Sequence, residues 1–522
     1  MCAKRKTPYG KSKIHLPAGD QAEIQVLYIH PAKQGVDFGV GENMGRPYGI
    51  IPVGLPAIIN LLKQNGIAVR GINYSLEKQI TPAFDIKHWL SQYKAAQIIL
   101  IDLHWYEHSY GAIQVAHLCK EVLPQAYTVL GGLSATCFAG QILEQFPTVD
   151  FVIRGDAEKP LLALAQHILQ TGAASSLTDI PNLSYRHGEA VIENACSYCA
   201  NTADLDGLDF ADISFMDHYR DYYVHEYIVT DIEAARQAFK SKPFWGKWIC
   251  TARGCKYECS YCGGCKSAHK TLANRDGIVT RSPRAVVDEI QRLQKAGVLQ
   301  ASLSYDIAEL GDEYWQEFFA LLGSSGVKIG LYNEFFQLPK PKFIQEFTRR
   351  AHMPHSCVAL SPLSGSERVR RLNGKLFSND QLLDTLELLD QVKANIFVYF
   401  SLNLPGENEG TFHETVDLAR LIYDFYPPSR LKILNTIHTI DPLSPMNLYP
   451  EKFGIESSMS TFMDYYSYCE QTQLALPEAK TEKLRGFKLA EPEKRVMEIM
   501  VQDWERHRTG RENSWWPVPP SW

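Results

Sequence analysis

The sequence predicts an α/β protein in two parts. A doubly wound, flavodoxin-like (Rossmann-like) parallel sheet comes first, followed by a partial (β/α)6 barrel of the TIM type and a small helical C-terminal appendix. Two series of short β-branched runs alternate with helical periods, over residues 21–172 and 246–450. Strands that alternate with helices form parallel sheets covered by those helices. A chain of 522 residues is also too long for one ordinary core, so two or three domains are expected.

Five strands are expected in the first series. Their runs are EIQVLYIH, AVRGINYS, QIILIDL, YTVLGG and FVIRGD, with helices between them, one of which lies near Phe84 to Tyr93. Ligands of such an open sheet bind beyond the carboxyl ends of its strands. Residues 21–172 are therefore expected to bind a ligand at that edge.

Six strands are expected in the second series, from Trp248 onward. Their runs are WICTARGC, QASLSYD, VKIGLYNE, SCVALSPL, NIFVYFSLN and RLKILNTIH. The first helix between them has Ser282 as its expected N-cap, Pro283 in its first turn and Gly297 just past its end, the usual start and stop residues of a helix.

Three further segments complete the expected organisation. Residues 1–20 form a polar tail, residues 173–245 an interdomain connection with Asp and Pro clusters, and residues 451–522 the C-terminal appendix. The first segment is basic but has no apolar run after it, which excludes a secretory signal. Twelve cysteines without such a signal indicate reduced thiols and a cytoplasmic location.

Net charge and the length of the apolar stretches argue against a nucleic acid partner and a membrane span. Lys and Arg number 53 against 59 Asp and Glu, a formal charge of −6, so no nucleic acid partner is expected. No stretch approaches 18 uninterrupted apolar residues, so no membrane span is expected.

Three cysteines after the first strand of the second series have an informative spacing. Cys255, Cys259 and Cys262 form C-x-x-x-C-x-x-C, which 12 cysteines in 522 positions would produce by chance only roughly 0.006 times. Three thiolates on one loop can hold three irons of a cubane cluster and leave the fourth iron open. Two alternatives remain: a zinc site completed by Cys265 or His269, or idle thiols.

The loop GCKYECSYCGG resembles the signature of the radical S-adenosylmethionine (SAM) superfamily, including Tyr261 before the last cysteine and the pair Gly263 and Gly264 after it. The resemblance implies a four-iron, four-sulfur (4Fe-4S) cluster whose open iron chelates SAM. One electron then cleaves SAM to methionine and a 5′-deoxyadenosyl radical. It also implies that the Tyr261 backbone lies near the adenine and the glycine pair near the methionine amino group, where a missing Cβ permits close approach.

Two later segments extend this resemblance over roughly residues 246–450. SGSERVRRLNGK resembles the family's segment after the fourth barrel strand, which meets the ribose and carboxylate of SAM, and NLPGENEGTF resembles the loop that closes over the adenine. Leu363 departs from the pattern, since many relatives have a Glu there. The SAM-binding residues implied by these two segments are Ser364, Gly365, Glu367, Arg368 and Gly406.

The first part resembles the cobalamin-binding domain of cobalamin-dependent radical SAM enzymes. The G-x-G-x-x-G of dinucleotide-binding sheets is missing after the first strand, which weighs against a dinucleotide. VLGGLSAT is similar to the fourth-strand turn of cobalamin-binding domains, and RGDAEKPL and GRPYGIIPVGLPAIINLLKQNG match two further segments. The cobalamin contacts implied are His104, Trp105, Tyr106, Gly131, Gly132, Ser134 and Thr136.

One feature of many cobalamin domains is missing here. In their D-x-H-x-x-G loop the His is the lower axial ligand of cobalt, but Gly49 and Ile51 stand where the Asp and His would fall. The run from Asp102 to His104 mimics the motif after the third strand, with Glu107 in the place of its Gly. We expect base-off cobalamin without a His ligand from the first loop. His104, Trp105, Tyr106 and His108 would then shape its lower face, or serve only in loop packing.

Together these resemblances imply an enzyme that methylates an unactivated carbon, or a phosphinate phosphorus, of a small molecule. It would use methylcobalamin, a 5′-deoxyadenosyl radical and an external electron donor of the flavodoxin or ferredoxin type. The alternatives are rearrangement, ring contraction or cyclisation without methyl transfer, and a non-catalytic corrinoid or redox sensor. Barrel chemistry occurs at the carboxyl ends of the strands, where a catalytic role or a structural hydrogen bond is expected for Tyr305, Asp306, Asn333, Glu334, Asn403 and His438.

Overall fold

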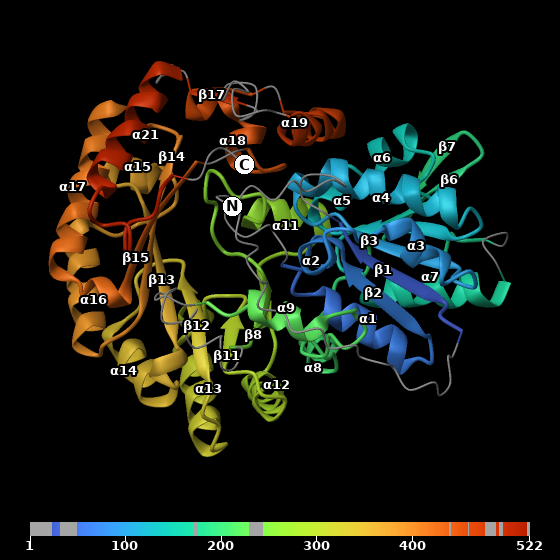
Figure 1. Cartoon of the computed structure of the whole chain (residues 1–522), viewed down its shortest axis with the longest axis horizontal. Coiled ribbons are helices and arrows are strands. Elements are labelled where there is room, and N and C mark those ends of the chain that lie inside the picture. Colours follow the sequence, from blue (N-terminus) through green and yellow to red (C-terminus); the bar gives the residue numbers. More distant parts are fainter. Residues whose placement is uncertain are drawn as a thin grey trace, which may run out of the picture.

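The computed structural model describes residues 23–31, 50–171, 176–228, 244–437, 440–457, 459–474, 487–489 and 494–518. Figure 1 shows two sheets side by side, each covered by helices, with the N-terminal sheet in blue and the second sheet in green to red. Helix α11 (Lys266–Ala273) lies between the two sheets (Figure 1).

The first sheet has the strand order β2-β1-β3-β4-β5-β6-β7. The five predicted strands are confirmed and run parallel: β1 (Val26–His30), β2 (Val69–Asn73), β3 (Ile98–Asp102), β4 (Tyr127–Gly131) and β5 (Phe151–Ile153). Two antiparallel strands, β6 (Leu183–His187) and β7 (Ala190–Glu193), extend its edge. The sheet thus continues past residue 172, where we expected the connection to begin, because a tight turn with Gly188 at φ +63° folds this segment into a hairpin.

Alternate side chains of the first sheet enter two cores, as expected for a doubly wound sheet. Val26 and Tyr28 of β1 pack in the core between the sheet and the helices α1 (Leu55–Gln64) and α7 (Glu158–Thr171). Leu27 and Ile29 pack on the opposite face. The helices of that face are α3 (Ile86–Ser91), α4 (Ser109–Val122), α5 (Leu133–Cys137) and α6 (Ala139–Gln145).

The second sheet has six parallel strands in the order β15-β14-β13-β12-β11-β8. Within the described residues no strand pairs with the outer side of β8, and β15 is met there only by a parallel bridge between Ile433 and Trp515. The sheet therefore does not close on itself and is an open, partial barrel, as predicted. Its strands are β8 (Gly246–Ile249), β11 (Gln300–Leu303), β12 (Gly330–Phe335), β13 (Cys357–Leu363), β14 (Ile396–Leu402) and β15 (Leu431–Ile437).

The barrel helices begin and end near the residues that the sequence indicates. The Ser282 side chain caps α12 (Pro283–Lys295) by accepting a bond from the Ala285 N–H, and Gly297 follows at φ +94°. The other helices on the outer face are α13 (Asp312–Ser324), α14 (Pro341–Arg350), α15 (Glu367–Leu372), α16 (Asn379–Gln391) and α17 (Glu409–Phe425).

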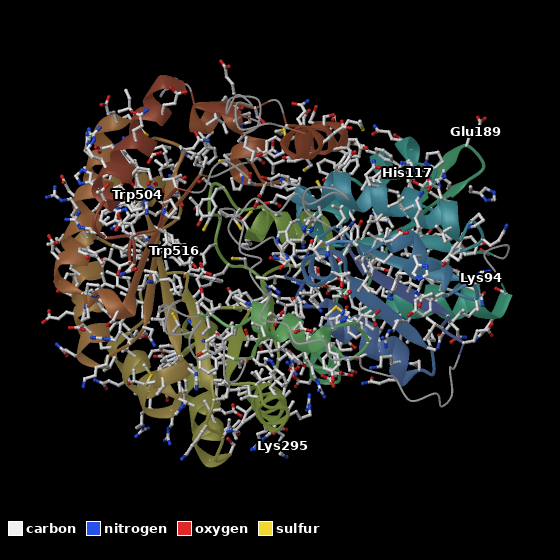
Figure 2. The ribbon with its side chains drawn as sticks, in the orientation of Figure 1. Lys94, His117, Glu189, Lys295, Trp504 and Trp516 are labelled. Atoms are coloured by element: carbon white, nitrogen blue, oxygen red, sulfur yellow. The ribbon has the colours of Figure 1, made fainter. Side chains whose placement is uncertain are left out.

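The C-terminal appendix packs on both parts of the molecule. Phe462 and Tyr465 of α19 (Phe462–Leu474) belong to the core of the first domain. Trp504 of α21 (Lys494–Arg508) packs against the barrel core, and its Nε1–H donates to the carbonyl of Trp516 at 2.8 Å (Figure 2). The described residues after 450 therefore pack on the cores of both sheets. Within the described ranges, no helix combines the length and apolar character that a membrane crossing requires.

Candidate active site

The cysteine loop lies at the carboxyl edge of the second sheet, between β9 (Ala252–Gly254) and α11 (Lys266–Ala273). The Tyr257 N–H donates to Cys255 Sγ at 3.4 Å, and the Gly264 N–H donates to Cys262 Sγ at 3.3 Å. Backbone N–H groups directed at sulfur are typical of iron–sulfur ligands, whose potential they tune. The loop is thus arranged to hold thiolates.

A zinc site is the alternative to a cluster at these cysteines. Zinc would need a fourth ligand beside the three sulfurs. Cys265, the candidate fourth zinc ligand, bonds Ser267 Oγ at 3.2 Å instead. Cys255, Cys259 and Cys262 fit a cubane cluster, whose cysteines bind separate irons.

The local charges also bear on thiolate formation. Burial raises the pKa of the Cys255 and Cys259 thiols, and the positive charge of Lys375 offsets part of this rise at both. Lys375 is buried, and its Nζ donates to the carbonyl of Phe336 at 2.8 Å. A cation is therefore fixed next to the sulfurs, where it would offset the negative charge of bound thiolates.

The three segments with family resemblance lie together in the structure. Tyr261 packs on Leu363, Val369 and Leu404, which come from the segments after β13 and β14. The Ser260 hydroxyl donates to the side-chain Oδ1 of Asn373, and the side-chain Nδ2 of Asn373 donates to the carbonyl of Pro405 at 3.0 Å. Packing thus joins the cysteine loop to both predicted SAM-binding segments.

Two of the glycines have packing reasons of their own. A Cβ on Gly263 would lie 2.6 Å from the carbonyl oxygen of Pro442, and the Gly263 N–H donates to the Asp441 carboxylate at 3.2 Å. A Cβ on Gly365 would overlap the backbone of Glu414 in α17. Close approach of backbone already excludes a side chain at both positions, with or without a ligand.

The other predicted SAM residues surround the turn after β13. Ser364 is fully buried against Thr415 of α17, and the Glu367 carboxylate accepts from the Asn379 N–H at 2.8 Å. Arg368 donates to the carbonyl of Gly406 at 2.8 Å, which joins the two segments. Gly406 itself has φ +82°.

Arg370 is a residue that sequence reasoning missed. Its buried guanidinium donates to the carbonyls of Pro362 and Ser364, and burial lowers its pKa to about 10. Leu363, between these two carbonyls, has φ +66° and interrupts the register of β13 with β14. Arg370 therefore stabilises the irregular end of β13. Sequence reasoning missed this role because an arginine at that distance after a strand has no recognisable pattern.

Some of the predicted catalytic residues have structural hydrogen-bond partners, whereas one of them is part-exposed near the cysteine loop. Burial raises the pKa of Asp306 to about 7, and its carboxylate accepts from the Asn333 amide at 3.0 Å and the Phe336 N–H at 2.9 Å. These bonds give Asp306 and Asn333 structural partners. The part-exposed Glu334 accepts from Ser361 Oγ at 3.2 Å. Burial raises the pKa of Tyr261, and the Cys259 and Cys262 thiols and then Glu334 add to this, so Glu334 lies near the cysteine loop.

Two further candidates adjoin the cluster loop and the adenine loop. Proximity to the Cys255 thiol contributes, after burial, to the raised pKa of Tyr305. The Asn403 N–H donates to the Glu407 carboxylate at 2.7 Å, and burial raises the pKa of Glu407 to about 8. His438 lies outside the described residues.

The predicted cobalamin residues lie together at the carboxyl edge of the first sheet. Gly132 has φ +114°, and a Cβ there would lie 2.6 Å from His104 Cα. Ser134 Oγ donates to the His104 carbonyl at 3.1 Å, and Thr136 Oγ1 accepts from the Gly155 N–H at 3.0 Å. Gly131 ends β4 beside this turn, and Trp105 contacts the His104 ring at 4.8 Å. Tyr106 packs instead on Tyr465 of α19, at 5.1 Å.

The segment RGDAEKPL joins the first sheet to the cysteine loop. Asp156 pairs with Arg253 at 3.2 Å and with Arg275, and Glu158 pairs with Arg253 at 2.5 Å. A Cβ on Gly155, which has φ +62°, would lie 3.0 Å from Ala273 Cα in α11. We refer to Asp156, Glu158, Arg253 and Arg275 as the interdomain clamp, because they connect the end of β5 to both flanks of the cysteine loop.

Comparisons with known proteins agree with this arrangement. Residues 249–419 match the family model described as the radical SAM superfamily. The chain is 24% identical over 382 residues to the anaerobic magnesium-protoporphyrin IX monomethyl ester cyclase of Cereibacter sphaeroides, which covers 71% of this chain and 55% of that protein. The chain spans about half the length of the curated cyclases it matches.

Two solved structures have the same overall fold. Both are of the radical S-adenosylmethionine methyltransferase TsrM from Kitasatospora setae. The form with cobalamin and a [4Fe-4S] cluster bound has a TM-score of 0.65 at 15% identity, covering 93% of this chain and 91% of that chain. The form with tryptophan substrate and a SAM analogue has a TM-score of 0.60 at 14% identity, covering 84% and 79%.

Proposed function

We propose that the chain is a cobalamin-dependent radical SAM enzyme that methylates an unactivated carbon or a phosphinate phosphorus of a small molecule. The match of residues 249–419 to the radical SAM family model supports this. The observation that carries the proposal is the arrangement of the two parts. The interdomain clamp joins the cysteine loop directly to the sheet edge that resembles a cobalamin site.

The proposed cofactors are a 4Fe-4S cluster, SAM and cobalamin, and each has residues that would hold it. Cys255, Cys259 and Cys262 would hold a 4Fe-4S cluster, and the segments around Tyr261 and Arg368 would hold SAM. The turn after β4, with Gly132 against His104, would receive cobalamin. When bound, the cluster and SAM supply radical chemistry and the corrinoid a transferable methyl group, while the protein binds, orients and shields them.

The surroundings of the site support two further parts of the proposal. The cluster needs single electrons, so we include an external donor of the flavodoxin or ferredoxin type. Every cysteine among the described residues is a free thiol, which fits the reducing cytoplasm. The part-exposed Glu334 is the residue we favour for contact with the small-molecule substrate, because it lies near the cysteine loop.

Cyclisation without methyl transfer is the second candidate. It is favoured by the similarity to the magnesium-protoporphyrin IX monomethyl ester cyclase, which covers 71% of this chain. The similarity to TsrM, a methyltransferase, extends over 93% of the chain but at 15% identity. The two reactions differ in their SAM-derived products, which makes them separable by experiment.

We expect the reduced, reconstituted protein to form both S-adenosylhomocysteine and 5′-deoxyadenosine from SAM in the presence of its substrate. Methyl transfer releases the first compound and hydrogen abstraction the second. Liquid chromatography with mass spectrometry measures both, together with the mass of the substrate product. Formation of 5′-deoxyadenosine alone, without a product heavier by one methyl group, would favour cyclisation instead.

For the bound corrinoid we expect no protein nitrogen on the lower face of the cobalt. In this proposal the His104 imidazole does not bind the cobalt. Electron paramagnetic resonance of the cobalt(II) form should show no strong nitrogen superhyperfine splitting, in the wild type and in His104→Ala alike. A three-line splitting that disappears in His104→Ala would make His104 the axial ligand and contradict this expectation.

A further inference from the structure

We propose that His30, Asp102 and His108 form a site for one divalent transition-metal ion of the zinc class, separate from the cysteine loop. His30 ends β1, Asp102 ends β3, and His108 ends the short 3-10 helix η1 (Tyr106–His108). One ligand atom from each lies within 4.8 Å of the other two. Within the described ranges, this is the group of His, Cys, Asp and Glu side chains gathered closely enough to hold one ion.

The position of the group matches where open sheets bind ligands. The strand order β2-β1-β3 places the change of direction of the sheet between β1 and β3, and ligands bind beyond the carboxyl ends of the strands at such a point. His30 and Asp102 are the last residues of these two neighbouring strands. Their side chains meet there although 72 residues separate them.

Burial makes the charge of this group significant. His30 and His108 are 0% exposed and Asp102 is 6% exposed. No Lys or Arg in the described part of the chain forms an ion pair with Asp102. A buried carboxylate requires a compensating cation, which a bound metal ion supplies.

The closest contact in the group marks where one ion could lie. His30 Nδ1 lies 2.9 Å from Asp102 Oδ1 and 3.1 Å from Oδ2, and the Tyr28 hydroxyl donates to Oδ1 at 2.7 Å. An ion bound by both residues would take the place of the proton that Nδ1 shares with the carboxylate, and Nε2 would then carry the ring proton. Carboxylates that bind a metal are commonly hydrogen-bonded in turn, as Asp102 is by Tyr28.

The donor set selects the class of ion. Two imidazoles and one carboxylate favour zinc and its transition-metal neighbours over Mg²⁺ or Ca²⁺, which prefer oxygen ligands. Three protein ligands leave a further coordination position open. A corrinoid cobalt, in contrast, offers one lower position, which one nitrogen fills. Three converging groups therefore indicate a separate ion, which would tie η1 to the ends of β1 and β3.

The test uses the full-length protein with its cluster reconstituted. Zinc is added alone, loosely bound metal is removed with a weak chelator, and retained zinc is measured by elemental mass spectrometry. About one zinc per chain is expected, with nitrogen or oxygen ligands at about 2.0–2.1 Å and no sulfur in the X-ray absorption spectrum. His30→Ala should retain at least tenfold less zinc, whereas His88→Ala, a change of an exposed histidine in α3, should retain it.

Asp102→Asn is a second variant, included in case His30→Ala fails to fold. It preserves the size of the side chain and removes its charge. With an unchanged circular dichroism spectrum, it too must lose zinc. Three results overturn the proposal. Sulfur ligands at about 2.3 Å would place the zinc in the cysteine loop, and failure to retain zinc would reduce the group to a buried hydrogen-bonded pair. Expulsion of zinc by cobalamin, with a cobalt(II) nitrogen splitting lost in His30→Ala, would make His30 a corrinoid ligand.

Discussion

Replacing Cys255, Cys259 or Cys262 by alanine is expected to reduce SAM cleavage to background and to lower bound iron well below the four per chain of a complete cluster. Each thiolate binds a different iron, so the loss of one leaves that iron without a protein ligand and destabilises the cluster. The measurements are iron and sulfide content after anaerobic reconstitution, and 5′-deoxyadenosine formation after reduction.

Cys265→Ala is the matched control for these variants. Cys265 lies three residues beyond Cys262, and its Sγ bonds Ser267 Oγ rather than another cysteine. Its removal should leave iron content and SAM cleavage unchanged. If Cys265→Ala were as damaging as the others while Cys255→Ala had no effect, or if the loop contained zinc and no iron, the cluster assignment would be wrong.

Asp156→Ala is expected to lower the free energy of unfolding by about 3–5 kcal/mol, the usual cost of removing one partner from a buried ion pair. Asp156 is 9% exposed and binds Arg253, Arg275 and the Ala200 N–H. Without it the buried Arg275 guanidinium loses its carboxylate. Unfolding in urea, monitored by circular dichroism, measures the change.

The same variant should also disturb the cysteine loop, because Arg253 lies two residues before Cys255 and Arg275 follows α11. We therefore expect a shift in the electronic absorption of the reconstituted cluster. Asp417→Ala removes an exposed pair with Arg420, 3.9 Å apart within α17, and should change stability by less than about 1 kcal/mol. A stability loss for Asp156→Ala no larger than that of Asp417→Ala would refute the role of the interdomain clamp.

Much of the fold follows from local sequence. The alternation of strands and helices predicted both parallel sheets, because hydrophobic period and turn residues act over a few positions. Ser282 and Pro283 marked the start of α12 for the same reason. Cys255, Cys259 and Cys262 likewise lie within one loop, so the amino-acid sequence alone is enough to predict a cluster site there.

Other features depend on residues far apart in the chain. The hairpin of β6 and β7 and the docking of α19 on the first domain rest on tertiary partners, so residues 173–245 and 451–522 were predicted only as a connection and an appendix. Gly365 looked like a ligand contact, but the approach of α17 also requires it.

What the sequence determined by itself was therefore the two α/β parts, the cysteine loop and the segments that resemble its partners. Only the tertiary structure decided that Asp156 pairs with Arg253 and Arg275, residues about 100 positions away, and that His30 meets Asp102 and His108. The physical reason is that the energies of buried charges and imidazoles depend on which groups packing brings within a few ångströms, and separation along the chain carries no signal of that.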